Sequence, residues 1–397
     1  MRRAALVVFA MAWTAAAQAT PIDVSGYVAA EVRIFPAEAK FARQHENAFS
    51  ASMALQPEMR WKPDDENTLT IIAFGRVDAD DSERTHWDIR EANWLYNAGD
   101  WDLRIGLGKV FWGVAESRHL VDIINQSDLV ESLDEEDKLG QPMANLNVIT
   151  GIGTWSAFVL PYFRERTFAG PDGRPGLPLP FDENLATFES SDKERHVDYA
   201  LRWQERLGDI DVGLSHFHGT GREPRLMPTL TPSGPVFAPH YDQIDQTGLD
   251  IQATLDAWLL KLEAIVRSGQ GETLFAATAG FEYTLYQLFE TTYDLGLIAE
   301  YHHDGRGSDA PFTVFNNDIM AGTRLALNDQ DDTAVLMGAI LDVETQTTLA
   351  TIEFSTRLAD GWKLEMEGRI FPYVANGSVE SNSEREHTFE LRVLRYF

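Results

Sequence analysis

The chain of 397 residues contains no cysteine. This absence excludes a small secreted fold held together by disulfides, and it also excludes thiol catalysis and cysteine-based metal sites. An exported protein does not need disulfides if a large closed sheet pairs its own backbone groups. The lack of cysteine is therefore compatible with an exported β-protein.

Long hydrophobic runs are also missing beyond the N-terminal segment. No stretch after residue 19 approaches the ~18 uninterrupted apolar residues that a membrane-spanning helix requires. Lipid offers no partner to an unpaired backbone N–H or C=O group. If this chain crosses a bilayer, it must therefore do so as a closed sheet.

Basic residues are scarce relative to acidic ones. The chain has 33 lysine and arginine residues against 62 aspartate and glutamate residues, which gives a formal net charge of -29. The phosphates of a nucleic acid would repel such a chain. We therefore expect no nucleic-acid partner.

The first 19 residues have the organisation of a secretory signal peptide. Two arginines are followed by an apolar stretch from Ala4 to Ala17, and Ala17-Gln18-Ala19 forms a small-x-small cleavage site. The apolar stretch is shorter than the ~20 residues of a membrane anchor, so cleavage is the preferred interpretation. We predict a cleaved signal peptide over residues 1–19.

Apolar and polar side chains alternate along most of residues 20–397. In the segment 362–370, apolar residues such as Trp362 and Leu364 alternate with charged residues such as Lys363 and Glu365. A strand of period 2 can place one row of side chains in lipid and the other in water. A soluble sandwich would rarely place four charges in succession on one face. We therefore predict an all-β fold, a transmembrane antiparallel up-and-down β-barrel formed by residues 20–397.

About 18 segments show this rhythm, and a count of 16 is also compatible with the sequence. The segments are residues 24–36, 47–61, 67–78, 85–97, 101–110, 141–150, 154–163, 195–206, 209–218, 246–256, 258–267, 273–286, 291–303, 318–328, 332–343, 348–359, 361–371 and 385–397.

The connections between these segments alternate in length. Those after even-numbered segments are short and rich in turn residues, as in Asp360-Gly361, whereas many of those after odd-numbered segments are long. Barrels with turns at one end and loops at the other follow this rule, but a sandwich has no reason to follow it. The long connections are residues 111–140, 164–194, 219–245, 303–317 and 372–384.

The sequence closes with nearly alternating residues before a terminal aromatic residue, Phe389-Glu390-Leu391-Arg392-Val393-Leu394-Arg395-Tyr396-Phe397. With the leader, the strand rhythm and the loop parity, this segment makes the chain resemble the bacterial outer-membrane porins of 16 or 18 strands. Arg395 departs from the family pattern, which usually places an outward apolar residue there. An arginine near a membrane boundary can reach the lipid headgroups, so the departure is tolerable.

The resemblance implies a channel in the outer membrane of a Gram-negative bacterium, through which small hydrophilic solutes or ions diffuse passively. It implies the lipid bilayer and these solutes as partners, and a homotrimer as the frequent assembly of porins of this size. Two alternatives stay open: a substrate-specific channel with a solute-binding track, and a closed structural or adhesive barrel. No motif identifies a subfamily.

In porins the loop after the fifth strand folds into the lumen and narrows it, and the corresponding segment here is residues 111–140. Its apolar residues recur with near-helical spacing, which predicts one or two short helices. Its acidic residues would then form the constriction of the pore, whereas the alternative is an extracellular lid with a solvated acidic face. The acidic residues are Glu116, Asp122, Asp128, Glu131, Asp134, Glu135, Glu136 and Asp137.

Four arginines project inward from the early strands by their phase: Arg33, Arg60, Arg76 and Arg104. Opposed rows of acids and bases across a narrow passage would create a transverse field that orients solutes and sorts ions. The alternative for each arginine is a salt bridge within the lumen wall, to Glu31, Glu58, Asp78 or Asp102. Because acidic residues prevail, we expect a mild preference for cations.

We expect no catalytic, cofactor or metal site. The histidines that could suggest a metal site are interpreted as solvated residues of the outer rim. Ser215 and His216 are neighbours in a strand and point to opposite faces, so they cannot form a nucleophile–base pair. The histidines in question are His196, His216, His218, His302 and His303.

Overall fold

The computed structural model describes residues 22–376 and 379–397. The predicted signal peptide, residues 1–19, lies outside the described residues and stays a prediction. Within the described residues, no helix is long and apolar enough to span a membrane.

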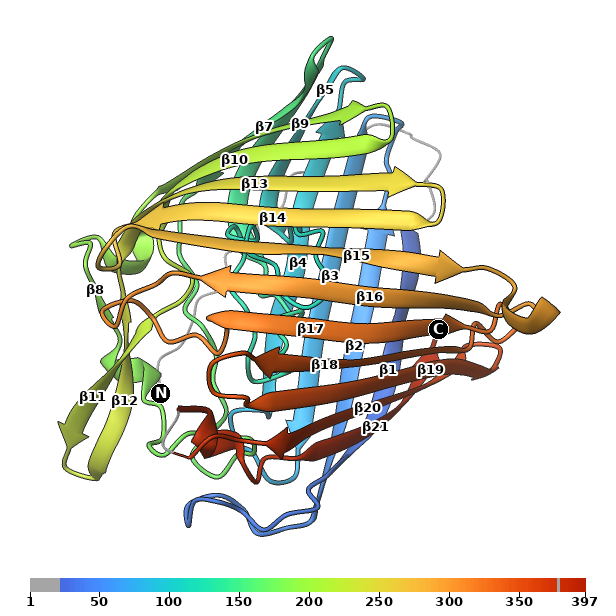
Figure 1. Cartoon of the computed structure of the whole chain (residues 1–397). Helices are drawn as coiled ribbons and strands as arrows, with labels where there is room; N and C mark the ends of the chain where they lie inside the picture. Colours follow the sequence, from blue (N-terminus) through green and yellow to red (C-terminus); the bar gives the residue numbers. More distant parts are fainter. Residues whose placement is uncertain (1–21, 377–378) are drawn as a thin grey trace.

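Eighteen antiparallel strands form one closed barrel, as predicted from the sequence (Figure 1). Each strand pairs with its neighbours along the chain, and β1 pairs with β21 to close the sheet. The barrel strands are β1 (Ile22–Ile34), β2 (Phe49–Trp61), β3 (Asn67–Asp78), β4 (His86–Asn97), β5 (Trp101–Gly108), β6 (Gln141–Thr150), β7 (Gly153–Leu160), β9 (Asp198–Leu207), β10 (Ile210–Thr220), β13 (Gln243–Leu255), β14 (Trp258–Ser268), β15 (Leu274–Leu285), β16 (Asp294–Asp304), β17 (Asn317–Ala326), β18 (Ala334–Asp342), β19 (Thr348–Ala359), β20 (Trp362–Tyr373) and β21 (Thr388–Tyr396).

The two ends of the barrel differ in their connections. The end that we call the loop end, at the left of Figure 1, carries the long connections. The opposite turn end carries short hairpins such as residues 208–209 and 360–361. A small three-stranded sheet lies at the loop end and consists of β8 (Thr187–Phe188), β11 (Arg225–Thr231) and β12 (Gly234–Tyr241).

The outer surface of the barrel is apolar, with tryptophans close to the turn end. Such a girdle of aromatic residues is typical of the boundary between lipid and water. Arg395 also lies at this end, with its guanidinium 5.6 Å from the centre of the Trp362 ring, so its polar group stays at the rim. The exposed tryptophans of the girdle are Trp61, Trp94, Trp101, Trp155, Trp258 and Trp362.

The segment between β5 and β6, residues 109–140, is fully described and contains no helix, so the prediction of short helices was wrong. Its apolar residues pack against the barrel wall instead of lining one helix face. Wall carboxylates accept hydrogen bonds from its N–H groups, which removes the need for helical bonding. The segment contributes Trp112, Leu120, Val121, Ile123 and Ile124 to a buried cluster with wall residues such as Phe158 and Phe217.

The helical turns of the described residues are short and of the 3-10 type. They are η1 (Glu183–Leu185), η2 (Lys193–Arg195), η3 (Leu288–Glu290) and η4 (Val379–Ser383), and all lie in connections between strands.

Candidate pore constriction

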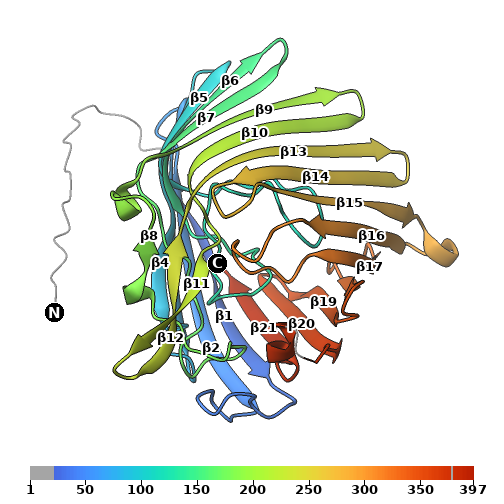
Figure 2. The same ribbon diagram turned by 60° about the vertical axis from the view of Figure 1, so that its left-hand side comes forward.

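Residues 109–140, which we call the inner loop, run through the inside of the barrel. Their teal trace is visible between the two walls in Figure 2. The inner loop contacts the wall of β1–β4 on one side and the wall of β14–β17 on the other. It therefore divides the lumen, and the alternative of a lid outside the barrel does not describe its position.

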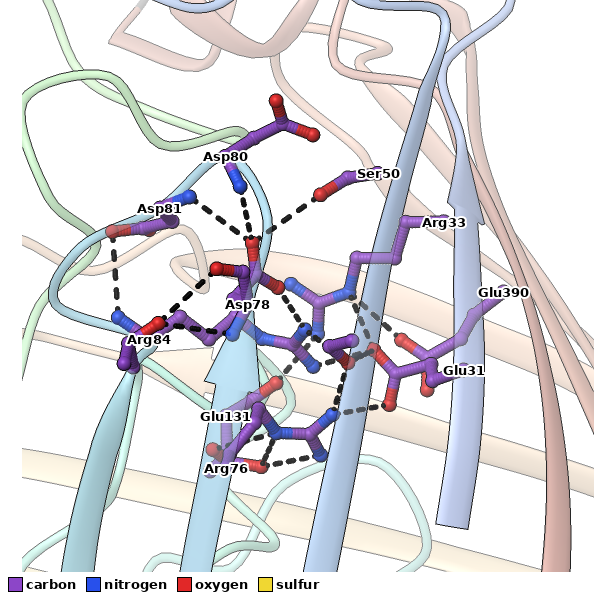
Figure 3. A network of polar contacts seen from close by, with 12 residues as sticks. Glu31, Arg33, Ser50, Arg76, Asp78, Asp80, Asp81, Arg84, Glu131 and Glu390 are labelled. Carbon is purple, nitrogen blue, oxygen red and sulfur yellow. Dashed lines mark hydrogen bonds and ion pairs between the residues drawn. The ribbon is translucent and has the colours of Figure 1, made fainter.

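Glu131 joins the inner loop to the β1–β4 wall (Figure 3). Arg76 donates to its carboxylate at 2.7 Å, and Arg33 donates to its main-chain carbonyl oxygen at 2.7 Å. His86 Nε2 lies 2.7 Å from the same carboxylate. Burial alone would raise the pKa of Glu131, but the contacts with His86 and Arg76 outweigh it and hold this pKa well below its ordinary value. The carboxylate therefore stays charged.

Glu31 continues this network behind the inner loop. Its carboxylate accepts hydrogen bonds from Arg76 at 2.9 Å and from Arg84 at 2.6 Å. Arg33 donates to Glu390 at 2.9 Å across the seam between β1 and β21. Each buried charge thus has a partner of opposite sign, which is the condition under which buried ion pairs are tolerated.

Glu263, on β14, holds the inner loop from the opposite wall. Its fully buried carboxylate accepts hydrogen bonds from the N–H groups of Val114 at 2.6 Å, Ala115 at 2.8 Å and Val121 at 3.1 Å. A carboxylate that receives several N–H groups acts on a loop as a cap acts on the start of a helix. One wall residue therefore fixes two turns of the inner loop.

Glu300, on β16, holds the next residues of the inner loop in the same way. It accepts hydrogen bonds from the N–H of Glu116 at 2.6 Å and from the N–H and hydroxyl of Ser117. The Ser117 hydroxyl is also 2.9 Å from His302 Nε2. These three residues do not form a catalytic triad, because Glu300 bonds the serine and comes no closer than 4.0 Å to the imidazole.

His119 links two parts of the inner loop and also lies near Glu263 of the wall. Its Nε2 is 2.8 Å from Glu136, and its Nδ1 is 3.8 Å from Glu263. Burial alone would lower the pKa of His119, but the neighbouring carboxylates of Glu136 and Glu263 raise it to about 10. His119 is therefore a cation at neutral pH.

The predicted acidic residues fall into two groups. Glu116, Asp128 and Glu131 pair with wall cations: Glu116 with Arg324 at 2.6 Å, and Asp128 with Arg90 at 2.5 Å. Asp122 accepts hydrogen bonds from the N–H groups of Trp112 and Gly113 inside the loop.

Of the remaining four predicted acids, Asp134, Glu135 and Glu136 line the cavity beside the inner loop, whereas Asp137 is not among its lining residues. Asp134 is 3.7 Å from Arg369, and Glu136 pairs with His119 as described above. Glu135 pairs with Arg166 of a neighbouring connection at 3.1 Å. Burial raises the pKa of Asp137, and the nearby charges of Glu131 and Asp134 raise it further.

Only some of the four predicted arginines contact the inner loop. Arg33 and Arg76 meet the inner loop, and both also form the wall salt bridges that were the alternative. Arg104 points to the loop's start, where it donates to the carbonyl of Lys109 at 3.5 Å. Arg60 faces Thr70 near the turn end, six residues along the strand from Ala54, which faces Arg76.

Several residues of this site were missed by sequence reasoning. Arg90 and His86 lie on the inward face of β4, and the phase that identified Arg76 could have identified them. Glu263 and Glu300 have the same inward phase on β14 and β16. Nothing in a single sequence shows that the inner loop crosses the lumen to reach these two carboxylates.

The predicted rim histidines do not all lie in solvent. His216 and His218 are exposed on the outer face, where His218 is 2.9 Å from Asp245. Ser215 is buried on the opposite face, as predicted. The interpretation was wrong for His302, which is fully buried beneath the inner loop because Ser117 and Thr278 bind its two nitrogens. Among the described residues, no group of three acidic or histidine side chains could hold a metal ion.

A cavity of about 1120 Å³ remains beside the inner loop. Its far wall is formed by β17–β20, and its near side is formed by inner-loop residues such as Glu116, Leu133 and Asp134. The inner loop therefore narrows the lumen without filling it.

No protein-family model matches the chain, and no curated protein sequence matches it. Its architecture is a closed barrel of 18 antiparallel strands. Solved structures that are similar include OmpT, an outer membrane protein of Vibrio cholerae, in a trimer form; it is 10% identical, covers 96% of this chain and 100% of that chain, and has a TM-score of 0.49. A mutant of the Rh. blastica porin is 11% identical over 95% of this chain and 100% of that chain, with a TM-score of 0.47.

Proposed function

We propose that this protein is an outer-membrane channel for the passive diffusion of small hydrophilic solutes or ions. The observation that carries this proposal is the inner loop, which is clamped to both walls and leaves a cavity of about 1120 Å³ beside β17–β20. A barrel with a purely structural role has no need of such a divided lumen. Charged side chains of the wall and of the inner loop lie on both sides of this cavity.

The outer surface supports a membrane location. The closed sheet leaves no backbone edge for lipid to meet, and the girdle tryptophans mark one boundary of the apolar band. With the predicted signal peptide, this supports the outer membrane of a Gram-negative bacterium, with the loop end facing outward. A homotrimer stays part of the proposal, and the mass of the protein–detergent complex, corrected for bound detergent, measures it.

The pore constriction consists of the acids of the inner loop that face the passage, opposite the bases of the far wall. Asp134 and Glu116 face Arg369 and Arg324. Such opposed charges produce a field across the passage, which acts on dipolar solutes and ions.

A mild preference for cations is the expected selectivity. The test is the reversal potential of a planar bilayer under a gradient of KCl. A clear preference for chloride would reject this part of the proposal while leaving the channel itself intact.

The experiment that tests the channel is single-channel conductance of the purified protein with a panel of ions and sugars. We expect steady conductance, and a larger conductance for a variant that lacks residues 115–138. A natively inserted protein without any conductance would overturn the proposal in favour of a closed structural barrel.

A further inference from the structure

The inward faces of β17, β18 and β19 share a strip without charge. The pairing of Gly322 with Gly338 and of Arg324 with Leu336 shows which side chains share the inward face. On that face β18 presents Ala334, Leu336, Gly338 and Ile340 in succession. The inward row of β14, by contrast, carries Lys261, Glu263 and Arg267, with Ile265 between the last two. We call Met320, Gly322, Leu336, Gly338, Ile340 and Leu349 the apolar strip.

The apolar strip is open to the passage. Its larger side chains, Leu336, Ile340 and Leu349, line the cavity and are only partly buried. The two glycines lie side by side, and the end of the Met320 side chain comes within 3.2 Å of where a Cβ would stand on each. A flexible methionine over two glycines forms an adaptable apolar floor.

The strip continues toward the loop end of the barrel. Phe312 and Val314, from the connection between β16 and β17, line the same cavity and are each 48% exposed. Across the passage Leu133 of the inner loop is 45% exposed. A solute with an apolar group therefore meets apolar surface from the mouth inward and on both sides of the passage.

A carboxylate without an ion-pair partner borders the strip. Glu353 lies opposite Leu336 on one side and opposite Glu367 on the other. It forms no ion pair with any residue of 22–376 or 379–397, and its side chain is exposed to the passage.

The basic groups around Glu353 are all engaged with other acids. Arg324 pairs with Glu116 at 2.6 Å and lies 3.5 Å from Glu282. Arg369 pairs with Glu367 at 3.1 Å, and Asp134 is 3.7 Å away. On the same wall Lys363 pairs with Glu365 at 2.8 Å and Arg392 is shared among Glu31, Glu365 and Glu390. The surplus charge next to the strip is therefore negative.

We propose that the apolar strip and Glu353 together form a binding track for organic cations that carry an apolar group. The positive head would lie at Glu353 and Glu367, while the apolar part would lie on Leu336, Ile340 and Leu349. This inference rests on the proposed channel function and names the solute class that the channel holds most strongly.

The test is block of the KCl current by phenyltrimethylammonium, compared with tetramethylammonium and with the anion benzenesulfonate. We expect phenyltrimethylammonium to block at about tenfold lower concentration than tetramethylammonium, because its ring buries apolar surface on the strip. We expect benzenesulfonate to block least. Equal block by the two cations, or stronger block by the anion, would overturn the inference.

Three variants assign the effect to its residues. Glu353→Gln should weaken the block by both cations about fivefold, since it removes the facing charge. Leu336→Asn should reduce the block by phenyltrimethylammonium to that by tetramethylammonium. The matched control is Glu58→Gln, which removes an inward carboxylate from β2, away from the strip. If the control weakens the block as much as Glu353→Gln does, the site is not at the strip.

The failure of the channel and the failure of the strip can be told apart. A barrel that conducts KCl without selective block contradicts the strip alone, and a barrel that does not conduct contradicts the channel. In the second case, calorimetric titration of the detergent-solubilised protein with phenyltrimethylammonium still reports on the strip. Binding that Glu353→Lys abolishes supports the strip, whereas no binding, or binding that this variant leaves unchanged, contradicts it.

Discussion

The β1–β4 wall and the β17–β20 wall are built from the same kind of strand, but their inward charges have opposite environments. On the first wall, Glu31 and Arg76 have side chains that are 1% and 3% exposed, because the inner loop covers them. On the second wall, Arg324 is 40% exposed and Lys363 is 35% exposed. The comparison shows that the inner loop, and not the wall, decides which inward charges are buried and which are open to the lumen.

The largest effect is expected from Glu131→Ala. This variant leaves Arg76 buried with fewer partners, and breaking a buried ion pair costs about 3–5 kcal/mol. The inner loop should detach from the β1–β4 wall, so the conductance should rise and the loop should become sensitive to protease. The control is Glu135→Ala on the exposed face of the same loop, and an equally large effect there would contradict the comparison.

The next effect is expected from Glu263→Gln on the opposite wall. Hydrogen bonds to a charged group contribute about 1.5–3 kcal/mol, and three loop N–H groups depend on this carboxylate. The loop should open more often, which increases the noise of the single-channel current. Glu353→Gln, on the β17–β20 wall, should leave the noise unchanged. An equal increase in noise in that variant would show that the β17–β20 wall also holds the loop.

The pH range in which the inner loop stays attached to the walls depends on two residues of the loop, Glu131 and His119. The pKa of Glu131 lies below its ordinary value of 4.5, so its contribution is present above this pH and is lost as the pH falls. The pKa of His119 is raised from 6.5 to about 10, so its contribution is complete below pH 6.5 and is lost as the pH rises through 10.

Current noise should therefore be lowest between about pH 4.5 and 6.5 and should increase toward both extremes. The measurement is the noise spectrum as a function of pH at constant salt. Replacing His119 by glutamine should remove only the alkaline limb. A flat profile in the unmodified protein would show that neither group holds the loop.

The smallest effect on stability is expected from Leu336→Ser in the apolar strip. A side chain that is open to the lumen gives up little buried surface, so the change should stay within about 0.5 kcal/mol. Thermal unfolding in detergent measures it, with Val121→Ser in the buried face of the inner loop as the contrasting variant. Comparable losses in the two variants would mean that the β17–β20 wall is packed as densely as the loop.

The barrel could be predicted from the sequence because the alternation of apolar and polar residues within each strand shows which of them face inward. Period 2, turn residues and alternating connection lengths are local signals, and they located all 18 strands. The inner loop was harder, since its apolar residues Leu120, Val121, Ile123 and Ile124 have helical spacing but pack against the wall. Tertiary contacts replaced the helix that local spacing favoured.

Of the residues that hold the inner loop, only those of the β1–β4 wall could be predicted. Inward phase identified Arg33 and Arg76, but phase alone also selected Arg60, which lies near the turn end, and Arg104, which reaches only the first residue of the inner loop. The partners Glu263 and Glu300 are more than 140 residues from the loop atoms that they bind. Such pairings depend on how the loop crosses the lumen, and one sequence holds no local signal for that path.

The seam between β1 and β21 constrains how the protein is made. Arg33 and Glu390, which bond across it, are separated by 357 residues, and Phe397 donates its N–H to the carbonyl of Gly26. Until both strands are delivered, each has a free edge that can pair with another chain. Biogenesis must therefore shield two unpaired edges until the final strand arrives, and a chain that loses β21 would expose both at once.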